Sequence, residues 1–301
     1  YAGAITGTGG LVKNGGGFEY LSGSISTYTG TNTVNAGFLQ VFNLADGGTA
    51  SSIGASSVGA GNLVLNGGTL MYVGAGDSTN RLLTLGASAS SALDASGTGA
   101  VQFTNTGALA FSSPNTTQTV TLTGTSTGNN SLALQLSDNG TGKTSVRKTG
   151  TGTWILRNPA STYTGITTII GGVLGVDKLA NGGQVSSLGQ SSGAAANLVI
   201  GSGATLRYTG AGDTTDRLFT IGARHAGLEL VRGAEPRFGE HPLRACDPLP
   251  EPGKPGIERN RLGADLLEVE FHVVLQVGAD ARPVCLYLDP HLLQMRARPD
   301  A

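Results

Sequence analysis

"STYTGTNTVNAGFLQV", residues 26–41, returns at residues 161–176 as "STYTGITTIIGGVLGV", so that the two stretches begin 135 positions apart. One inserted residue then changes the offset to 136, and "YVGAGDSTNRLLTLG" (72–86) returns as "YTGAGDTTDRLFTIG" (208–222). Identities over so long a span establish an internal repeat. A period of this length holds several supersecondary units, which is typical of solenoids and arrays.

Within each copy the sequence predicts short β-strands. "TVTLTG" (119–124) alternates Val120 and Leu122 with threonines, and "LALQL" (132–136) alternates leucines with small or polar residues. This two-residue period, interrupted by Gly, Asn and Asp, indicates half-buried strands joined by tight turns. No convincing helical period occurs before Gly222.

Three architectures fit short strands and turns: a sandwich, a propeller and a parallel β-helix. A sandwich buries large apolar residues between two faces, and the first 222 residues contain only thirteen aromatics. Propeller blades repeat at about 40–50 residues, a period that is not seen. Stacked turns of roughly 20–25 residues suit small side chains such as Ser, Thr, Ala and Val better. The sequence therefore predicts an all-β parallel β-helix for residues 1–222.

Charge and composition exclude several partners for this part of the chain. Up to Gly222 it holds nine basic and eight acidic residues, which gives no electrostatic case for nucleic acid or anionic lipid. No stretch approaches the roughly 18 apolar residues of a membrane span, and no signal peptide is present. The chain begins at Tyr1 without a methionine, so we expect an internal fragment that does not span a membrane.

The segment "KTGTGTWILRNPASTYTGITTIIGGVLGV" (148–176) resembles the passenger-associated transport repeat of bacterial autotransporters. The family pattern runs Gly-x-Gly-x-Leu, then Thr-Tyr-x-Gly-x-Thr, then Gly-x-Leu. The matching residues here are Gly150, Gly152, Trp154, Leu156, Thr162, Tyr163, Gly165, Thr167, Gly172 and Leu174. The earlier copy diverges in "VKNGGGFEYLSG" (12–23) and regains the pattern from Thr27 to Val41.

The resemblance implies a passenger region of type V secretion, folded as a right-handed parallel β-helix outside a Gram-negative cell. Its expected partners are the outer-membrane β-barrel translocator, which is missing from this fragment, and the surface of a host or neighbouring cell. Folding of each turn on the previous one would support export. We therefore expect a non-enzymatic stalk or scaffold, with no catalytic, cofactor-binding or metal-ligating residue and no cofactor.

The first alternative is an adhesin segment that binds glycans or a matrix protein. Tyr28 and Tyr163 would serve it if they formed an exposed aromatic stripe. Their position inside the repeat signature favours packing within the scaffold instead.

The second alternative is the scaffold of a polysaccharide-cleaving β-helix enzyme, which needs clustered carboxylates and a base. Asp77 and Arg81 recur as Asp213 and Arg217, with Asp216 added. Because the pair repeats with the scaffold, a structural role is favoured, either turn capping or a surface ion pair. No histidine precedes residue 225, which removes the commonest general base.

Two further motifs have ordinary explanations. "GTGKTS" (140–145) resembles the end of a phosphate-binding loop, but Ser137 stands where that motif needs glycine, so we predict a solvated turn. The Asn-x-Ser/Thr triplets at Asn115, Asn129 and Asn139 indicate polar loops.

The repeat ends abruptly at Ala223, where "TIGARHAGLELVRGAEPRF" fails to continue as "TLGASASSALDASGTGAVQF" does in the first copy. Residues 223–301 are either a genuine domain of unknown fold or a frameshifted or chimeric sequence. The abrupt loss favours the second interpretation, and with it weak order. His241, Cys246, Cys285 and His291 lie in this tail, but their spacing predicts neither a metal site nor a disulfide.

Overall fold

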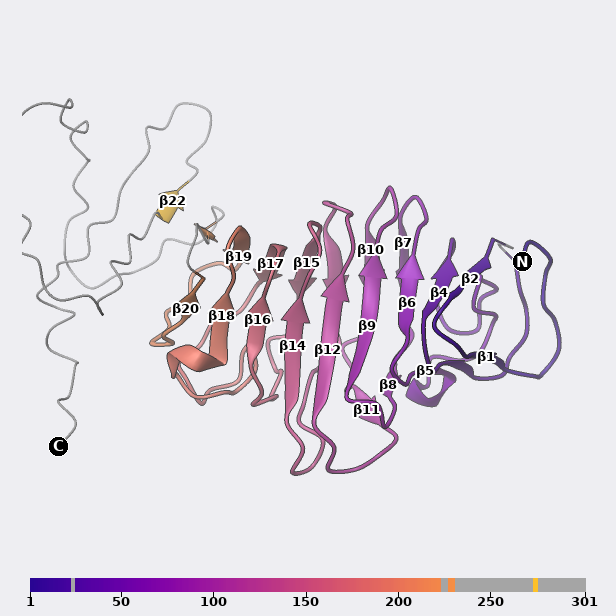
Figure 1. Ribbon diagram of the computed structural model, residues 1–301, viewed down its shortest axis with the longest axis horizontal. Helices are drawn as coiled ribbons and strands as arrows, with labels where there is room; N and C mark the ends of the chain where they lie inside the picture. Colours follow the sequence, from indigo (N-terminus) through magenta and orange to yellow (C-terminus); the bar gives the residue numbers. More distant parts are fainter. Residues whose placement is uncertain (23–24, 223–226, 231–272, 276–301) are drawn as a thin grey trace, which may run out of the picture.

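The computed structural model describes residues 1–22, 25–222, 227–230 and 273–275. Their strands stack along one long axis, with the N-terminus at one end (Figure 1). Within the described residues the named strands form three sheets, and all the pairings between them are parallel. The prediction of an all-β parallel β-helix is therefore confirmed.

The strands divide among the sheets as follows. The first sheet contains β1 (Leu11–Lys13), β3 (Asn32–Val34), β5 (Leu63–Leu65), β8 (Thr84–Leu85) and β11 (Ala110–Phe111). The second contains β2 (Phe18–Leu21), β4 (Phe38–Val41), β6 (Thr69–Tyr72), β9 (Ser90–Ala95), β12 (Gln118–Thr123), β14 (Thr144–Lys148), β16 (Thr167–Ile169), β18 (Leu198–Ile200) and β20 (Thr220–Ile221). The third contains β7 (Asp77–Thr79), β10 (Val101–Phe103), β13 (Asn130–Leu132), β15 (Thr153–Leu156), β17 (Gly172–Val176), β19 (Ala204–Tyr208), β21 (Gly227–Leu230) and β22 (Val273–Leu275).

The alternation seen in the sequence places leucines inside and threonines outside. In β12, Val120 and Leu122 are buried while the threonines between them are partly exposed. Across the second sheet Leu70 pairs with Leu93, and Leu93 pairs with Leu122. In these ladders Leu, Ile and Val face in and many threonines face out, although some Thr side chains, such as Thr167, are buried as well.

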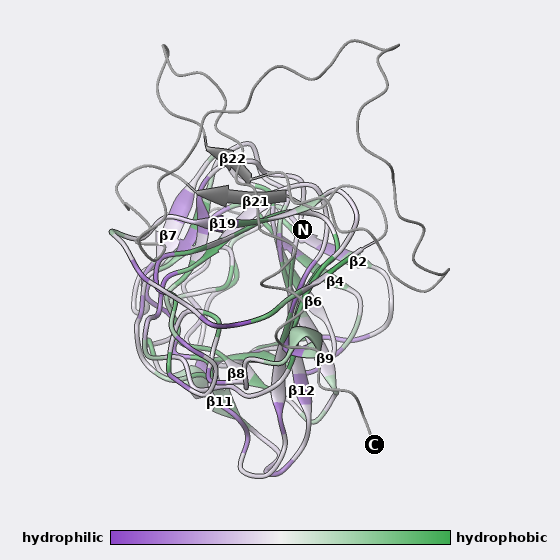
Figure 2. Ribbon diagram, turned by 90° about the vertical axis from the view of Figure 1, so that its left-hand side faces the viewer, coloured by the Kyte–Doolittle hydropathy of each residue, from purple (hydrophilic) through white to green (hydrophobic). Residues whose placement is uncertain are grey.

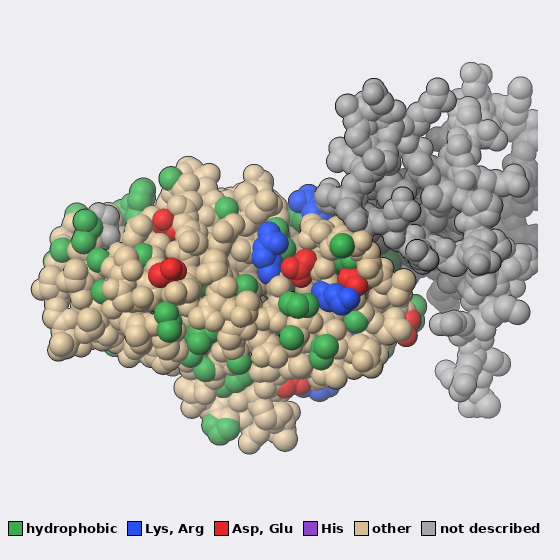
Figure 3. Space-filling view, turned by 180° about the vertical axis from the view of Figure 1, so that it is seen from behind, with side chains coloured by type: hydrophobic (Ala, Val, Ile, Leu, Met, Phe, Trp, Pro, Cys, Tyr) green, Lys and Arg blue, Asp and Glu red, His purple; other side chains and the backbone are tan. Residues whose placement is uncertain are grey.

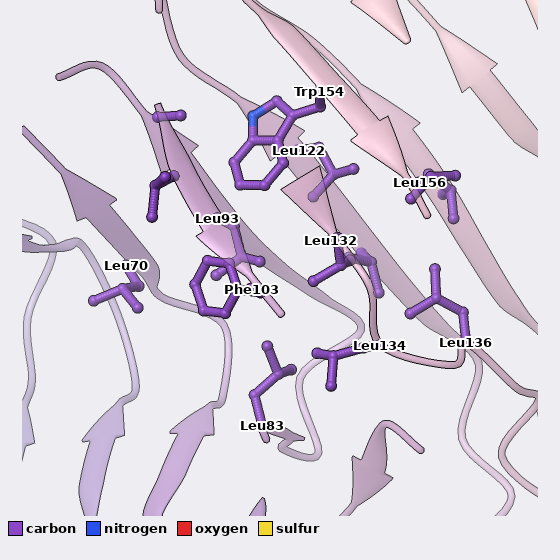
Figure 4. Close-up of a cluster of buried hydrophobic side chains, with 14 of the residues drawn as sticks. Leu70, Leu83, Leu93, Phe103, Leu122, Leu132, Leu134, Leu136, Trp154 and Leu156 are labelled. Carbon is purple, nitrogen blue, oxygen red and sulfur yellow. The ribbon is translucent and has the colours of Figure 1, made fainter. Parts of the chain in front are cut away.

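All three sides of each turn contribute to one interior. The turns superimpose around it when viewed along the axis (Figure 2), and the close-up shows leucines from different sides meeting there (Figure 4). From the third sheet, Phe103 pairs with Leu132 and Leu132 with Leu156. Each fully buried leucine contributes about 1.5–3 kcal/mol relative to an exposed one, so these ladders supply much of the stability.

The turns vary in length. Leu11 pairs with Asn32, 21 positions on, whereas Asn32 pairs with Leu63, 31 positions on. The longer turn contains an irregular excursion at residues 42–62, and its counterpart in the second copy spans residues 177–197. Each excursion ends in a single 3-10 turn, η1 (Ala60–Asn62) or η2 (Ala195–Asn197).

The two copies of the repeat start on different faces of the helix. β1 lies in the first sheet, whereas β14, which holds the equivalent residues of the second copy, lies in the second sheet. β2 follows β1 within the same turn, and five successive pairings lead from β2 to β14. One repeat therefore advances the chain by five complete turns plus one face.

The third sheet continues beyond Gly222, because β21 pairs with β19 and β22 pairs with β21. The remaining residues of the tail, with His241, Cys246, Cys285 and His291, lie outside the described residues. The predicted origin and weak order of 223–301 stay predictions.

Candidate functional site

The two signature tyrosines face the interior. Tyr28 is 1% exposed and Tyr163 is 0% exposed. The Tyr163 hydroxyl lies 2.8 Å from Thr167 Oγ1, and the Tyr28 hydroxyl donates to the side-chain oxygen of Asn32. Burial raises the pKa of both phenols to about 12. The alternative of an exposed binding stripe at these two residues is therefore wrong, and packing within the scaffold is confirmed.

A glycine in the next turn lies directly against each tyrosine. Gly189 has φ +71, and a Cβ there would lie 2.4 Å from the Tyr163 carbonyl oxygen. Gly54 repeats this contact with Tyr28, at 2.3 Å. The glycine allows the two turns to approach closely.

Replacement of Gly189 by alanine is expected to lower the free energy of unfolding by at least about 2 kcal/mol, because backbone strain and a steric clash combine. Gly183→Ala is the matched control, since Gly183 has φ +81 but no neighbour within 4 Å of its would-be Cβ. Thermal melting compares the two variants. Equal losses would show that the close contact with Tyr163 contributes nothing.

Arg81 is 1% exposed and binds the backbone of the 42–62 excursion. Its Nη1 donates to both the carbonyl and the hydroxyl of Ser56 at 2.7 Å, and its Nη2 donates to the Gly54 carbonyl at 2.9 Å. Its Nε donates to the Ala45 carbonyl at 3.1 Å. The guanidinium thus holds the excursion closed from within.

Arg217 holds the 177–197 excursion in the same way. It donates to Ser191 Oγ at 2.8 Å, to the Gly189 carbonyl at 3.0 Å and to the Ala180 carbonyl at 3.2 Å. The predicted structural role of the repeated arginine is confirmed. The suggested surface ion pair with the repeated aspartate is wrong, because the arginine is buried and its partners are largely carbonyls.

The repeated aspartates cap turns. Asp77 Oδ2 accepts from the Leu44 amide at 3.0 Å and from the Tyr72 hydroxyl at 3.1 Å, and both contacts recur at Asp213. Asp213 also forms an ion pair with Lys178. Burial alone would raise the pKa of Asp213, but the hydrogen bond from Lys178 and its other donors outweigh it and lower the pKa. Turn capping is therefore the common role.

Within the described residues, exposed aromatic side chains gather near the N-terminal end of the second sheet. Phe18, Tyr20 and Phe42 are 64%, 38% and 48% exposed. The rings of Phe18 and Phe38 stack with centroids 4.3 Å apart, and Tyr20 meets Phe42 edge to face at 6.1 Å. We call these four residues the aromatic cluster.

The aromatic cluster does not belong to the repeated scaffold. Its counterparts 135 positions on are Thr153, Ile155, Val173 and Asp177. Sequence reasoning missed it, although the available signal was the set of aromatics in one copy that fail to recur in the other. Elsewhere, one face of the molecule is dominated by uncharged side chains with few Lys, Arg, Asp and Glu (Figure 3).

The other candidate sites in the described residues hold few acidic or metal-ligating side chains. A cavity of about 500 Å³ lies beside β1 and β2, and the only carboxylate among its lining residues is that of Glu19. Within the part of the chain that the structure describes, no group of three His, Cys, Asp or Glu side chains could hold a metal ion. The same part contains no helix with the length and apolar character that crossing a membrane requires.

The remaining sequence motifs have structural places. "GTGKTS" leads into strand β14 rather than a helix, and Lys143 is exposed, so this segment is a turn as predicted. Asn115 and Asn129 are exposed. Asn139 departs from the prediction, because it is buried and its side-chain amide donates to the Ser113 carbonyl at 2.7 Å.

Comparison with known proteins agrees with the repeat. A family model described as passenger-associated-transport-repeat matches residues 11–41 and 146–176, which are separated by the same 135 positions. The adhesin BmaC autotransporter of Brucella suis biovar 1 (strain 1330) is 58% identical over 234 residues, which is 78% of this chain and 7% of that protein. The chain thus spans a small fraction of this relative. No solved structure gives a significant match. With its stacked parallel turns and two transport repeats, the chain belongs to the passenger regions of autotransporters, which are displayed at the outer surface of Gram-negative bacteria.

Proposed function

We propose that this segment is a non-enzymatic stalk and export scaffold of a longer passenger. The observation that carries the proposal is the repetition of the same buried contacts in both copies, at Tyr28 and Tyr163 and again at Arg81 and Arg217. Each turn pairs with its neighbours along the axis, so each newly exported turn would find a template in the adjacent one. The proposed partner for export is the outer-membrane translocator of the whole protein.

A scaffold tolerates the loss of a complete turn but not of a partial one. Val120 of β12 pairs with Val146 of β14, so deletion of residues 121–146 joins Val120 to Arg147 within the strand and removes one turn in register. Deletion of residues 121–145 joins Val120 to Val146 and leaves one extra residue inside the strand, which turns every following side chain of the strand to the opposite face. The two deletions differ by a single residue.

Surface display of the full-length passenger, measured by antibody labelling of intact cells, tests the proposal. The in-register deletion is expected to retain display within about twofold, whereas the out-of-register deletion should reduce it at least about tenfold, as misfolded turns lose their buried ladders. Equal display of the two variants, high or low, would contradict a role that depends on stacking.

Adhesion is a second candidate, because the aromatic cluster is exposed and absent from the second copy. The relative is named an adhesin. Aromatic rings provide apolar contact area, and glycans are the ligands that we propose for them. The replacements Phe18→Thr, Tyr20→Ile, Phe38→Val and Phe42→Asp convert the cluster to the residues of the second copy, which the same fold already accommodates.

Glycan-array binding by the full chain and by this fourfold variant tests adhesion. Binding that falls at least about tenfold in the variant would support an adhesive role for the cluster. Equal binding by both chains, or no binding by the unsubstituted chain, would contradict it and leave the stalk proposal unaffected.

A further inference from the structure

One ladder of the interior is interrupted by a charged residue. Along the second sheet Leu122 pairs with Lys148, and Lys148 pairs with Ile169. Lys148 is 0% exposed, although its neighbours on either side are aliphatic. An ammonium group within an apolar ladder is costly unless hydrogen-bond acceptors surround it.

Three backbone carbonyls accept hydrogen bonds from the Lys148 Nζ atom. They belong to Thr149 at 2.6 Å, to Gly150 at 3.0 Å and to Gly171 at 3.0 Å. The first two lie at the corner that follows β14. The third lies in the next turn, between β16 and β17, so the complete set of acceptors exists only when that turn has paired with β14.

The first copy contains the same arrangement. Lys13 Nζ donates to the carbonyls of Asn14 at 2.9 Å, Gly15 at 2.7 Å and Ala36 at 3.2 Å. These acceptors are the residues 135 positions before those of Lys148. Two of them again lie in the lysine's own turn and one in the next, although the two copies start on different faces.

Register is otherwise weakly specified in such a chain. A slip of two residues preserves the alternation of inward and outward side chains, so the hydrophobic pattern alone does not forbid it. The strands around Lys148 are short and rich in threonine and glycine, which offer little shape to distinguish one alignment from another. A buried charge with acceptors at fixed positions distinguishes the native alignment from a slipped one.

We propose that the buried lysine of each transport repeat is a register key: its ammonium finds all three carbonyls only in the native alignment of two successive turns, and a slipped turn leaves the buried ammonium without its third acceptor. The lysine thus excludes wrong pairings more than it raises stability. Buried polar groups have this role of fixing register in coiled coils.

Because only the protonated Lys148 needs all three carbonyls, the selection of the native register depends on pH. Burial lowers the pKa of Lys148 from 10.5 to about 8. β12, β16 and β17, which pack on β14, carry no titratable side chain, and Arg147 on the same strand faces outward. A slipped turn can avoid the incompletely bonded charge by releasing the proton, and given the native pKa of about 8 this disfavours it against the native turn about tenfold at pH 7 and hardly at all at pH 10.

Cysteine cross-linking of the refolded full chain tests the proposal. Arg147 pairs with Thr168 across β14 and β16, so cysteines at these positions report the native register. Cysteines at Arg147 and Ile166 are too far apart to bond in that register, and they report a slip of two residues. Cys246→Ser and Cys285→Ser remove the native thiols.

After refolding at pH 7 and mild oxidation, the chain with Lys148 is expected to give the native cross-link alone. Lys148→Met should give the slipped cross-link as well, increased at least about tenfold, while retaining the native one. Ile169→Met is the matched control, an apolar exchange at the next position of the ladder, and should behave as the parent. Refolding and oxidising the parent at pH 10 should produce the slipped cross-link without any change at Lys148.

Three results would overturn the register key. If the Lys148→Met chain formed the native cross-link alone, the remaining contacts would already fix the register. A Lys148→Met chain that forms neither cross-link would show that the lysine is needed for folding itself. A parent chain that gives no slipped product after refolding at pH 10 would show that the charge does not select the alignment.

Discussion

Replacement of Arg81 by methionine is expected to lower the free energy of unfolding by at least about 3 kcal/mol. Methionine keeps the apolar part of the side chain and removes the guanidinium. The carbonyls of Ser56, Gly54 and Ala45 then each lose one of two donors, and a hydrogen bond to a charged group contributes about 1.5–3 kcal/mol. Urea denaturation followed by the fluorescence of Trp154, which is the one tryptophan of the chain, measures the loss.

Arg147→Met is the control for this experiment, because Arg147 lies on an outward position and is exposed. Its effect should stay within about 0.5 kcal/mol. Arg81→Lys should recover little of the loss, since one ammonium cannot reach the acceptors that the planar guanidinium spans. Similar values for Arg81→Met and Arg147→Met would contradict the assignment of Arg81 as the internal support of the excursion.

Tyr163→Ala is expected to lower the free energy of unfolding by about 3–5 kcal/mol, because it empties the volume of a fully buried ring. Tyr163→Phe removes only the hydroxyl contact with Thr167 and should cost about 1 kcal/mol. The same denaturation experiment measures both variants. The ratio of the two losses separates the packing of the ring from its hydrogen bond.

Phe42→Ala serves as the comparison, since Phe42 is an exposed aromatic residue. This replacement is expected to change the free energy of unfolding by less than about 1 kcal/mol. A small loss for Tyr163→Ala would mean that the ring is not a core residue. It would reopen the possibility that the signature tyrosines bind a ligand.

The periodicity of the sequence was sufficient to predict the architecture of the repeated part of this chain. The alternation in β12 predicted which side chains face inward, and the repeat predicted a stack of similar turns. The recurrence of Asp77 and Arg81 also identified them as structural, since a residue that returns with the scaffold is expected to serve the scaffold.

Other features depend on three-dimensional contacts that a linear pattern does not contain. Lys148 occupies an inward position of a perfectly alternating strand, but only the cross-strand register places the Gly171 carbonyl within reach of its ammonium. A surface ion pair was one of the two structural roles expected for the arginine, because charges usually lie at the surface, whereas the excursion of 42–62 folds its carbonyls over the guanidinium. The rotation of the second copy by one face follows from the number of strands per turn, which the 135-residue period does not reveal.

The advance of one repeat by five turns and one face is tested most directly by distances between pairs of spin labels. Thr69 and Val199 lie five pairings apart in the same outward ladder, so nitroxides at these positions should be separated by about 24 Å, at about 4.8 Å per turn. Labels at Thr33 and Thr168, which are equivalent residues of the two copies, lie on different sheets and should be farther apart than this. A Thr33–Thr168 distance that equals the Thr69–Val199 distance, or a Thr69–Val199 distance far from 24 Å, would contradict the stacked and rotated arrangement.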